Sequence, residues 1–249
     1  MGEPNWPFVG TEALAAGDVS RRTLRSRHTM VYRNVHLQNG RQLTAVTRAV
    51  AAWLWSGRQA TAAGLSAAAL HGSAWIDACR PAELIRTEAG DTGGIVIHRD
   101  TLWEDEVCVV GGIPVTTPAR TAFDLGRRKS LVAAVIRLDA LAHATELKPV
   151  DVELPAERHR GARGLVQLRR ALDLMDGGAE SPQETRTRLL LVNSICCVIG
   201  RGWWWPALAQ HCRRRAVAGS PNVDLMHAFC AELCHKPTLG ESRLAITLA

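Results

Sequence analysis

The sequence predicts an α+β protein, and three observations support this. Helix-capping residues precede apolar helical stretches, as Ser20, Thr117 and Ser181 do. Short apolar runs within residues 82–116 are separated by Gly and Asp, which is typical of short strands in a small mixed sheet. Beyond residue 193 the apolar residues follow neither the period of a strand nor that of a helix, so we expect a poorly ordered C-terminal segment.

Composition indicates a globular protein with a basic surface. At 249 residues, 47% hydrophobic and 22% charged, the chain can bury a core. The net charge of +6 is carried almost entirely by arginine and suits a polyanionic partner such as DNA. The chain has no apolar run long enough to span a membrane and its N-terminus does not resemble a signal peptide. We expect a cytoplasmic protein with no membrane partner.

Residues 8–40 have the pattern of a winged helix-turn-helix. A first helix is expected at 10–16, a turn at Gly17-Asp18, and a second helix at 21–27 that Ser20 caps. The alternating residues 30–37, with Asn39-Gly40, predict a hairpin wing. A recognition helix needs such a polar, arginine-bearing face to reach phosphates and base edges. The candidate DNA contacts are Arg21, Arg22, Arg25, Arg27 and Arg33. The alternative is that these arginines form a solvated face.

Two helices are expected next. Residues 43–55 are strongly apolar and end before Gly57. Residues 64–72 form a small-residue helix that we expect Ser66 to cap and Gly72 to end. Ser66 and His71 could suggest a nucleophile and its base, but no nearby acid orients the histidine, so packing is the favoured interpretation.

A middle domain follows, with strands expected at 82–86, 94–99, 106–110 and 113–116. The last strand enters a helix that Thr117 caps, with Pro118 at its first position. Polar residues at the strand ends could line a site, but such residues more often close strand ends with salt bridges, which we favour. These residues are His98, Arg99, Asp100 and Arg120.

Three more segments complete the expected helices. Residues 131–144 are amphipathic, Pro149 and Pro155 mark a linker, and a further helix covers 165–175. A last helix begins after Ser181, with Pro182 at its first position and Glu184 in a capping box. The expected domains are therefore a winged helix at 1–42, an α+β middle domain at 43–176, a helix at 177–192 and an aberrant or disordered tail at 193–249.

Three of these stretches together resemble actinobacterial proteins with an AbiEi-type antitoxin N-terminal region. They are the winged-helix start, the segment 65–72 and the segment 115–125, and the resemblance covers about residues 8–192. It implies a DNA-binding antitoxin that represses its own operon through the winged helix and pairs with a nucleotidyltransferase toxin. Double-stranded DNA and such a toxin are thus the expected partners.

In those relatives the helix at 177–192 opens an endonuclease-like domain similar to very-short-patch-repair nucleases of the PD-(D/E)XK class. Glu184 matches the helix glutamate of that pattern, but no strand carboxylates follow it, so Glu184 is expected to be vestigial. The alternative function is therefore a Mg²⁺-dependent endonuclease that has lost its catalytic core. We expect no cofactor, with Mg²⁺ required only if this alternative holds. A third possibility is a protein-binding remnant.

The tail at 193–249 is interpreted as the nuclease region translated in a shifted reading frame, because it is rich in Cys, Trp, His and Arg without a periodic pattern. A zinc site is the rival interpretation, but the spacing lacks the paired knuckles of zinc-binding domains, so no metal is expected. The run of arginines at 213–215 is taken as accidental. The cysteines and the histidine concerned are Cys196, Cys197, Cys212, Cys230, Cys234 and His235.

Overall fold

The computed structural model describes residues 6–87 and 93–199, and its contacts divide the chain into two units, Met1–Asn193 and Ser194–Ala249. The predictions for the tail fall outside the described residues, except that a helix continues to Ile199. The elements that precede this last helix all lie in the first unit. None of the helices in the described ranges combines the length and the apolar character of a membrane span.

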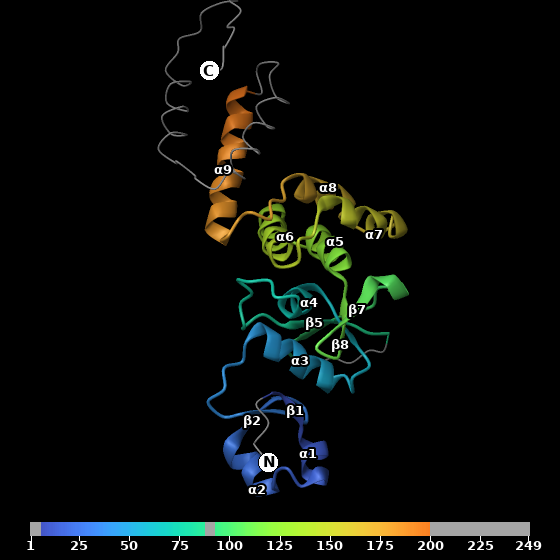
Figure 1. Ribbon diagram of the computed structural model, residues 1–249, viewed down its shortest axis with the longest axis vertical. Coiled ribbons are helices and arrows are strands. Elements are labelled where there is room, and N and C mark those ends of the chain that lie inside the picture. The colour runs from blue at the N-terminus through green and yellow to red at the C-terminus, as the bar shows by residue number, and fades with distance from the viewer. Residues whose placement is uncertain (1–5, 88–92, 200–249) are drawn as a thin grey trace, which may run out of the picture. The chain divides into compact units, whose positions relative to one another are not determined.

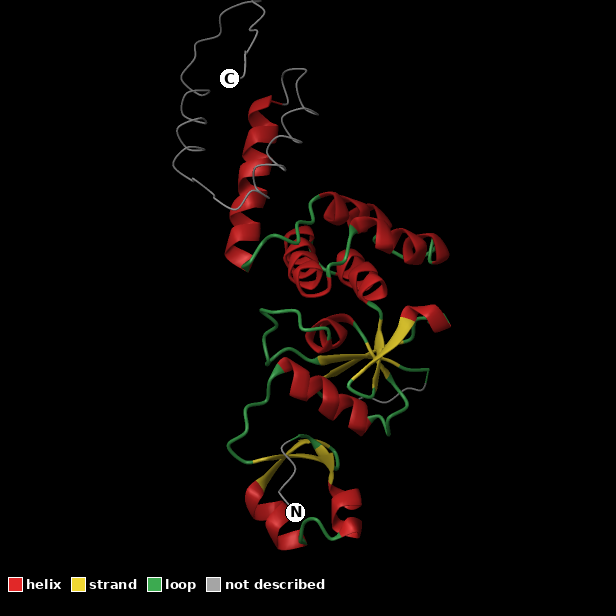
Figure 2. Cartoon of the chain, in the orientation of Figure 1, coloured by secondary structure: helices red, strands yellow, loops and turns green. Residues whose placement is uncertain are grey.

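The N-terminal module is a three-stranded antiparallel sheet with two short helices on one face (Figure 2). The strands lie in the order β1-β3-β2. The expected helices are confirmed, but the hairpin turn lies at Arg33-Asn34, and Asn39-Gly40 instead follows the last strand. Asn34 adopts a left-handed φ of 62°, which asparagine tolerates better than most residues. The elements are β1 (Phe8–Val9), α1 (Gly10–Ala16), α2 (Arg21–Arg27), β2 (His28–Tyr32) and β3 (Val35–Gln38).

The middle domain contains a mixed sheet, as predicted, but with five strands in place of the four expected, in the order β6-β5-β4-β8-β7. The strands β5 and β6 are parallel, as are β4 and β8, whereas the pairs β4-β5 and β7-β8 are antiparallel. The two-residue strand β4 was not expected. A short 3-10 helix, η1 (Glu104–Glu106), precedes β7. The strands are β4 (Thr61–Ala62), β5 (Ala82–Ile85), β6 (Ile95–His98), β7 (Val107–Val110) and β8 (Ile113–Thr116).

Helix α3 (Ala45–Trp55) lies between the two sheets (Figure 1). Its alanines Ala49, Ala51 and Ala52 are fully buried, which lets both sheets approach the helix closely. One core cluster therefore joins the N-terminal sheet, through Val35, with α3 and the five-stranded sheet.

Helix α4 (Gly64–Leu70) follows β4, and its cap differs from the prediction. The N-cap is Ala63, and Ser66 lies inside the helix, where its buried Oγ accepts a hydrogen bond from the Glu83 backbone N–H at 2.9 Å. Gly64 has a φ of +52°, and a Cβ built there would lie 2.1 Å from the Glu83 carboxylate. A side chain at residue 64 would therefore collide with the neighbouring strand.

The remaining helices form a second core cluster, centred on Phe123, Leu138 and Leu168. The expected linker around Pro149 and Pro155 is wrong, because this segment is helical. Pro149 occupies the first position of η2 and Pro155 lies in the first turn of α7, where a missing N–H removes no helical hydrogen bond. The helices are α5 (Pro118–Arg128), α6 (Leu131–Thr145), η2 (Pro149–Val152), α7 (Glu153–Arg158) and α8 (Leu165–Asp173).

Helix α9 (Pro182–Ile199) starts with the predicted cap, since Ser181 Oγ accepts from the Glu184 backbone N–H at 3.2 Å. Its first turns are bonded to α6 through the buried carboxylate of Asp139. That carboxylate accepts from Thr185 Oγ1 and from Arg188 Nη2, both at 2.7 Å. Burial raises the pKa of Asp139 in spite of these bonds. Leu189 completes the attachment by packing in the second core cluster.

Candidate nucleic-acid interface

The arginine-bearing helix α2 is held at its start by a side-chain cap. Ser20 is extended, with φ −88° and ψ 160°, and its Oγ accepts from the Thr23 backbone N–H at 3.0 Å. No residue of α2 is buried, because the helix covers the sheet with only the half-exposed Thr23 and Leu24. The structure thus brings four of the predicted contacts together on one exposed helix: Arg21, Arg22, Arg25 and Arg27.

The end of α2 is fixed to the hairpin by hydrogen bonds. His28 Nδ1 donates to the Thr23 carbonyl at 3.3 Å, and Asn39 Nδ2 donates to the Ser26 carbonyl at 3.1 Å. Thr29 Oγ1 donates in turn to Asn39 Oδ1 at 2.8 Å. Asn39 therefore joins β2 to α2, although the sequence pattern had suggested a turn residue of the wing. These bonds present the arginines from a helix of fixed orientation.

Arg33 lies apart from the other four arginines. It occupies the hairpin turn, whereas α2 joins β2 at the opposite end of that strand. At about 3.3 Å per residue, the five residues of β2 separate the two positions by roughly 17 Å. The turn is bonded to α1, since Asn34 Nδ2 donates to Thr11 Oγ1 at 2.9 Å and Asn34 Oδ1 accepts from the Thr11 backbone N–H at 3.1 Å. Arg33 is exposed at this tip.

Two histidines lie beneath the interface, against Phe8. The Phe8 ring makes an edge contact with His28, with centroids 5.1 Å apart, and stacks on His36 at 6.1 Å. Burial and the neighbouring His28 both lower the pKa of His36. Gly10 is required here, because a Cβ at residue 10 would lie 2.8 Å from His36 Cδ2. The rings serve as packing under α1 and the sheet.

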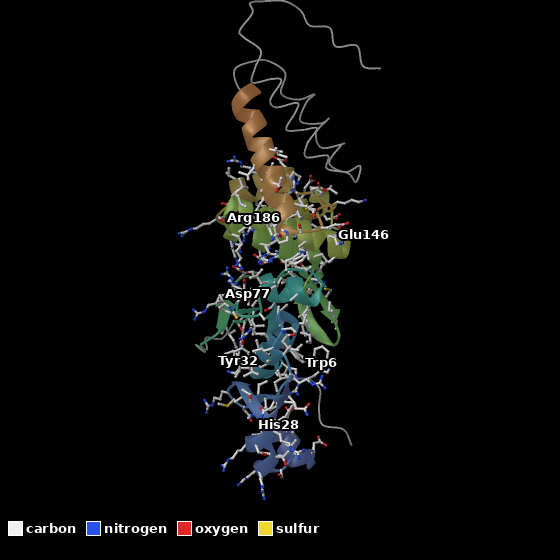
Figure 3. The ribbon with its side chains drawn as sticks, turned by 90° about the vertical axis from the view of Figure 1, so that its left-hand side faces the viewer. Trp6, His28, Tyr32, Asp77, Glu146 and Arg186 are labelled. Carbon is white, nitrogen blue, oxygen red and sulfur yellow. The ribbon has the colours of Figure 1, made fainter. Side chains whose placement is uncertain are left out.

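Polar contacts as well as the shared core tie the module to the middle domain. Arg58 Nη1 and Nη2 donate to the two carboxylate oxygens of Glu12 at 2.7 and 2.6 Å, which lowers the pKa of Glu12. Tyr32, labelled with His28 in Figure 3, is buried and donates its hydroxyl hydrogen to the Gly94 carbonyl at 3.1 Å. Burial raises the pKa of Tyr32. The interface arginines are therefore carried on a module that is anchored to the sheet behind it.

The polar strand-end residues form a charge-balanced network, which confirms the salt-bridge interpretation for Asp100 and Arg120. Arg120 is fully buried, and its Nη1 pairs with Glu106 Oε2 while its Nε donates to Asp124 Oδ2 at 3.1 Å. His159 Nε2 lies 2.8 Å from Glu106 Oε1. Asp100 pairs with Arg127 and Arg128, and lies 3.8 Å from Arg120. This network joins η1, α5 and the residue that follows α7, and it has a structural role.

The acids of this network, Glu106 and Asp124, and a third buried acid, Glu83, were not identified from the sequence. Glu106, Asp124 and Glu83 lie far apart in the chain and show no shared motif. Glu83 accepts from His98 Nε2 at 3.0 Å and from Lys129 Nζ at 3.2 Å. Burial alone would raise the pKa of Glu83, but these two partners lower it below its ordinary value. The one signal in the sequence is that an acid such as Glu83 stands between apolar residues of an expected strand, where burial would require a partner for its charge.

The other candidate catalytic residues have structural partners. His71 Nε2 donates to the Thr116 carbonyl at 2.8 Å and Ser66 bonds to Glu83, so the two do not form a nucleophile-base pair. Glu184 accepts from Ser181 Oγ and from the Glu180 backbone N–H, both at 3.0 Å, and so caps α9. In the part of the chain that the structure describes, no group of three His, Cys, Asp or Glu residues is placed to hold a metal ion.

Comparison with known proteins gives matches to the middle domain. The family model "AbiEi antitoxin C-terminal domain" matches residues 50–174, from within α3 to the end of α8. Two proteins of Mycobacterium tuberculosis, both named only as uncharacterized, one from strain CDC 1551 and one from strain H37Rv, are 33% identical over 84 residues. This match spans 34% of the present chain and 31% of each relative, so the chain spans about a third of their length.

Proposed function

Because the chain belongs to the AbiEi antitoxin C-terminal domain family, we propose that it is an antitoxin-type regulator that binds double-stranded DNA through its N-terminal module. In this proposal the module is a winged helix-turn-helix acting on DNA in the cytoplasm. Helix α2 is its recognition helix and the β2-β3 hairpin is its wing. The middle domain supplies the antitoxin role for which the family is named.

The exposed arginine face of α2 is the observation that carries the DNA-binding proposal. Arg21, Arg22 and Arg25 are exposed and make no ion pair with any residue that the structure describes. Guanidinium groups in this state can neutralise phosphates and release the counterions condensed on DNA. The cap at Ser20 and the bonds of Asn39 fix the helix, so little side-chain and backbone entropy beyond that of the arginines would be lost on binding.

The topology of the module supports the same assignment. A hairpin follows α2 directly and its second strand pairs with β1, so the sheet closes against the two helices. Arg33 at the hairpin tip then contacts the DNA at a separate position, as expected for a wing that follows the backbone. In this arrangement Arg21, Arg22, Arg25 and Arg27 make the helix contacts and Arg33 makes the wing contact.

The proposed protein partner is a toxin of the nucleotidyltransferase type. The family name supports a toxin partner, and the resemblance of the sequence to AbiEi antitoxins supports this class of toxin. Co-expression tests this part: growth arrested by a nucleotidyltransferase gene from the same locus is restored by the full chain, and growth that stays arrested contradicts the pairing.

The DNA-binding proposal is tested by replacing Arg21, Arg22 and Arg25 with alanine in the full chain. Fluorescence anisotropy with duplex DNA from upstream of the gene is measured over a range of salt concentrations. Each lost phosphate contact is expected to reduce the slope of log K against log salt by about 0.9, and affinity falls accordingly. The matched control replaces the exposed Arg163, Arg169 and Arg170 with alanine. This variant loses the same charge, but from the α8 region.

Equal effects of the two triple variants would show that net charge alone attracts DNA, and would contradict a specific role for α2. An unchanged salt slope in the α2 variant would contradict the proposal directly. Thermal unfolding monitored by circular dichroism verifies that both variants are folded.

A further inference from the structure

An apolar stripe is exposed on the helical segment that the sequence suggested was a linker. Val150 in η2 and Leu154 in α7 are 59% and 50% exposed. Trp103, in the loop before η1, is 53% exposed and is joined to α7 by Arg158, whose Cζ lies 5.6 Å from the centroid of the Trp103 ring. Large apolar side chains gathered on one surface indicate an interaction site more often than single exposed ones do.

This stripe is the outer face of an element whose inner face is already packed. Val152 is fully buried in the second core cluster and Pro155 is buried, while His159 reaches the Glu106 carboxylate. A helix on the surface of a domain normally has a polar outer face. The segment 149–158 instead carries apolar residues on both faces, so its outer face has apolar surface to bury in a contact.

The tryptophan end of the stripe is held in place. The Arg158 guanidinium lies over the Trp103 ring, with Cζ 5.6 Å from the centroid. Arg158 Nη1 also donates to both carboxylate oxygens of Asp105 at 2.5 Å, and this bond lowers the pKa of Asp105. The ring is thus oriented before any partner binds, which reduces the entropy that binding would cost.

Carboxylates are next to the residues of the stripe in the sequence, although the chain as a whole is basic. Glu104, Glu153 and Glu157 are exposed and form no ion pair with any residue in the described ranges. Glu153 and Glu157 are four residues apart, so their like charges lie side by side on α7. We call these carboxylates and the stripe the acidic apolar face: Trp103, Glu104, Val150, Glu153, Leu154 and Glu157. A nucleic acid would be repelled here, whereas a basic surface with an apolar residue is complementary.

The same chain presents such a surface on its N-terminal module. Arg21, Arg22 and Arg25 are exposed on α2, and Met30, which is 61% exposed on β2, lies three residues after this helix. This basic surface and the acidic apolar face are both exposed within the unit Met1–Asn193. Within this unit α2 and α7 lie on opposite sides of the five-stranded sheet (Figure 1), so a contact between the two surfaces requires two molecules.

We propose that the acidic apolar face binds the arginine face of α2 from a second copy of this chain. The contact is head-to-tail, so each molecule offers both halves and assembly proceeds from one copy to the next. Salt weakens the contact because its charges are exposed. Self-association and DNA binding exclude one another if α2 also binds DNA, which rests on the proposed function.

The test is charge reversal in the full chain, followed by sedimentation velocity over a range of protein and salt concentrations. Wild-type protein is expected to self-associate, and the association weakens as salt is raised. E153R/E157R and R22E/R25E are each expected to be monomeric at the wild-type association midpoint, with affinity reduced about tenfold or more by like-charge contacts. A mixture of the two variants is expected to associate again, because the reversed faces are complementary.

The apolar part is tested separately with Leu154→Ser, which is expected to weaken association about tenfold. Val166→Ser on α8 is the matched control, since Val166 is also exposed and lies outside the face. The inference is overturned if the wild type stays monomeric at every concentration reached. Binding of a different basic protein by the acidic apolar face of a monomeric chain would overturn it as well. It is also overturned if the mixture of charge-reversed variants does not recover.

Duplex DNA separates this inference from the proposed function. Displacement of the second copy by DNA supports both the contact between copies and DNA binding by α2. Association that follows the charge-reversal pattern but persists with DNA supports the contact and counts against DNA binding by α2. If the wild-type protein binds DNA but does not self-associate, the contact between copies is overturned and the proposed function stands.

Discussion

Arg120 shows how much one buried side chain can determine in this molecule. Its guanidinium is fully buried and pairs with the carboxylates of Glu106 and Asp124, while its Nη1 donates to the Thr101 carbonyl at 3.1 Å. A buried ion pair does not guarantee net stability, because desolvation offsets the attraction between the charges. Removing one partner is different, since the remaining charges are left without compensation in the interior.

We predict that Arg120→Met lowers the free energy of unfolding by about 3–5 kcal/mol. The physical reason is that the buried Glu106 would keep only His159 as a partner, while the buried Asp124 would lose Arg120 and keep Arg127. Urea denaturation measured by circular dichroism gives the value. Arg160→Ala is the control, because Arg160 is exposed and its loss is expected to change stability by no more than about 0.5 kcal/mol. Equal stability of the two variants would contradict a structural role for the network.

At the scale of elements, the features predicted correctly from sequence are those with local causes. The caps at Ser20, Thr117 and Ser181 are confirmed because each depends on a side chain and a backbone N–H three residues away. Ser66 was wrongly assigned as a cap, because its hydroxyl bonds instead to Glu83, a strand residue that is remote in sequence. A local pattern cannot reveal such a partner.

The unexpected elements are likewise determined by distant contacts. Strand β4 has two residues and exists because it pairs with β5 on one side and β8 on the other. Helix α7 contains Pro155, and the proline alone predicts a linker. It is tolerated in the helix because it lies in the first turn. The helix that carries four of the five candidate arginines was predicted correctly, because its cap is local. The roughly 17 Å distance to Arg33 follows from the hairpin register, which the alternating pattern left open.

Helix α9 allows a prediction at this scale. Asp139→Ala would leave Thr185 and Arg188 without their shared acceptor and lower the free energy of unfolding by about 3 kcal/mol. Hydrogen exchange of residues 185–189 is expected to accelerate more than that of α5. Asp18→Ala, at an exposed position, is the control. It should leave the free energy of unfolding and the hydrogen exchange of residues 185–189 unchanged. Uniform acceleration over the chain would show that Asp139 acts on global stability rather than on the attachment of α9.

At the scale of the whole molecule, the described cores belong to the unit Met1–Asn193. One core cluster extends from the N-terminal sheet across α3 to the five-stranded sheet, and the other extends through the helices to Leu189. The network around Arg120 joins η1 to helix α5 and to His159, which follows α7. The unit therefore contains the packing and the charge compensation needed to fold.

We predict that a chain ending at Asn193 folds by itself, with a Tm within about 2 °C of the full chain. A chain ending at Asp176 would lose Leu189 and leave Asp139 without its α9 partners, so its Tm is expected to fall by about 6–12 °C. Calorimetry of the three proteins measures both differences. A large loss of stability on removing only residues 194–249 would show that the first unit depends on the second.

Helix α3 has a consequence for how this architecture can be inherited. The family match begins at residue 50, inside α3, whereas the helix begins at Ala45 under a cap from Thr44 and packs against the N-terminal sheet as well as the middle one. A recombination event at the edge of the matched region would cut this helix in two and separate the cap from the turns it supports. Exchange of the N-terminal module between relatives must therefore keep α3 whole and its small-residue surfaces matched to the incoming sheet. The unit that evolution can shuffle is then longer than the unit that sequence similarity outlines.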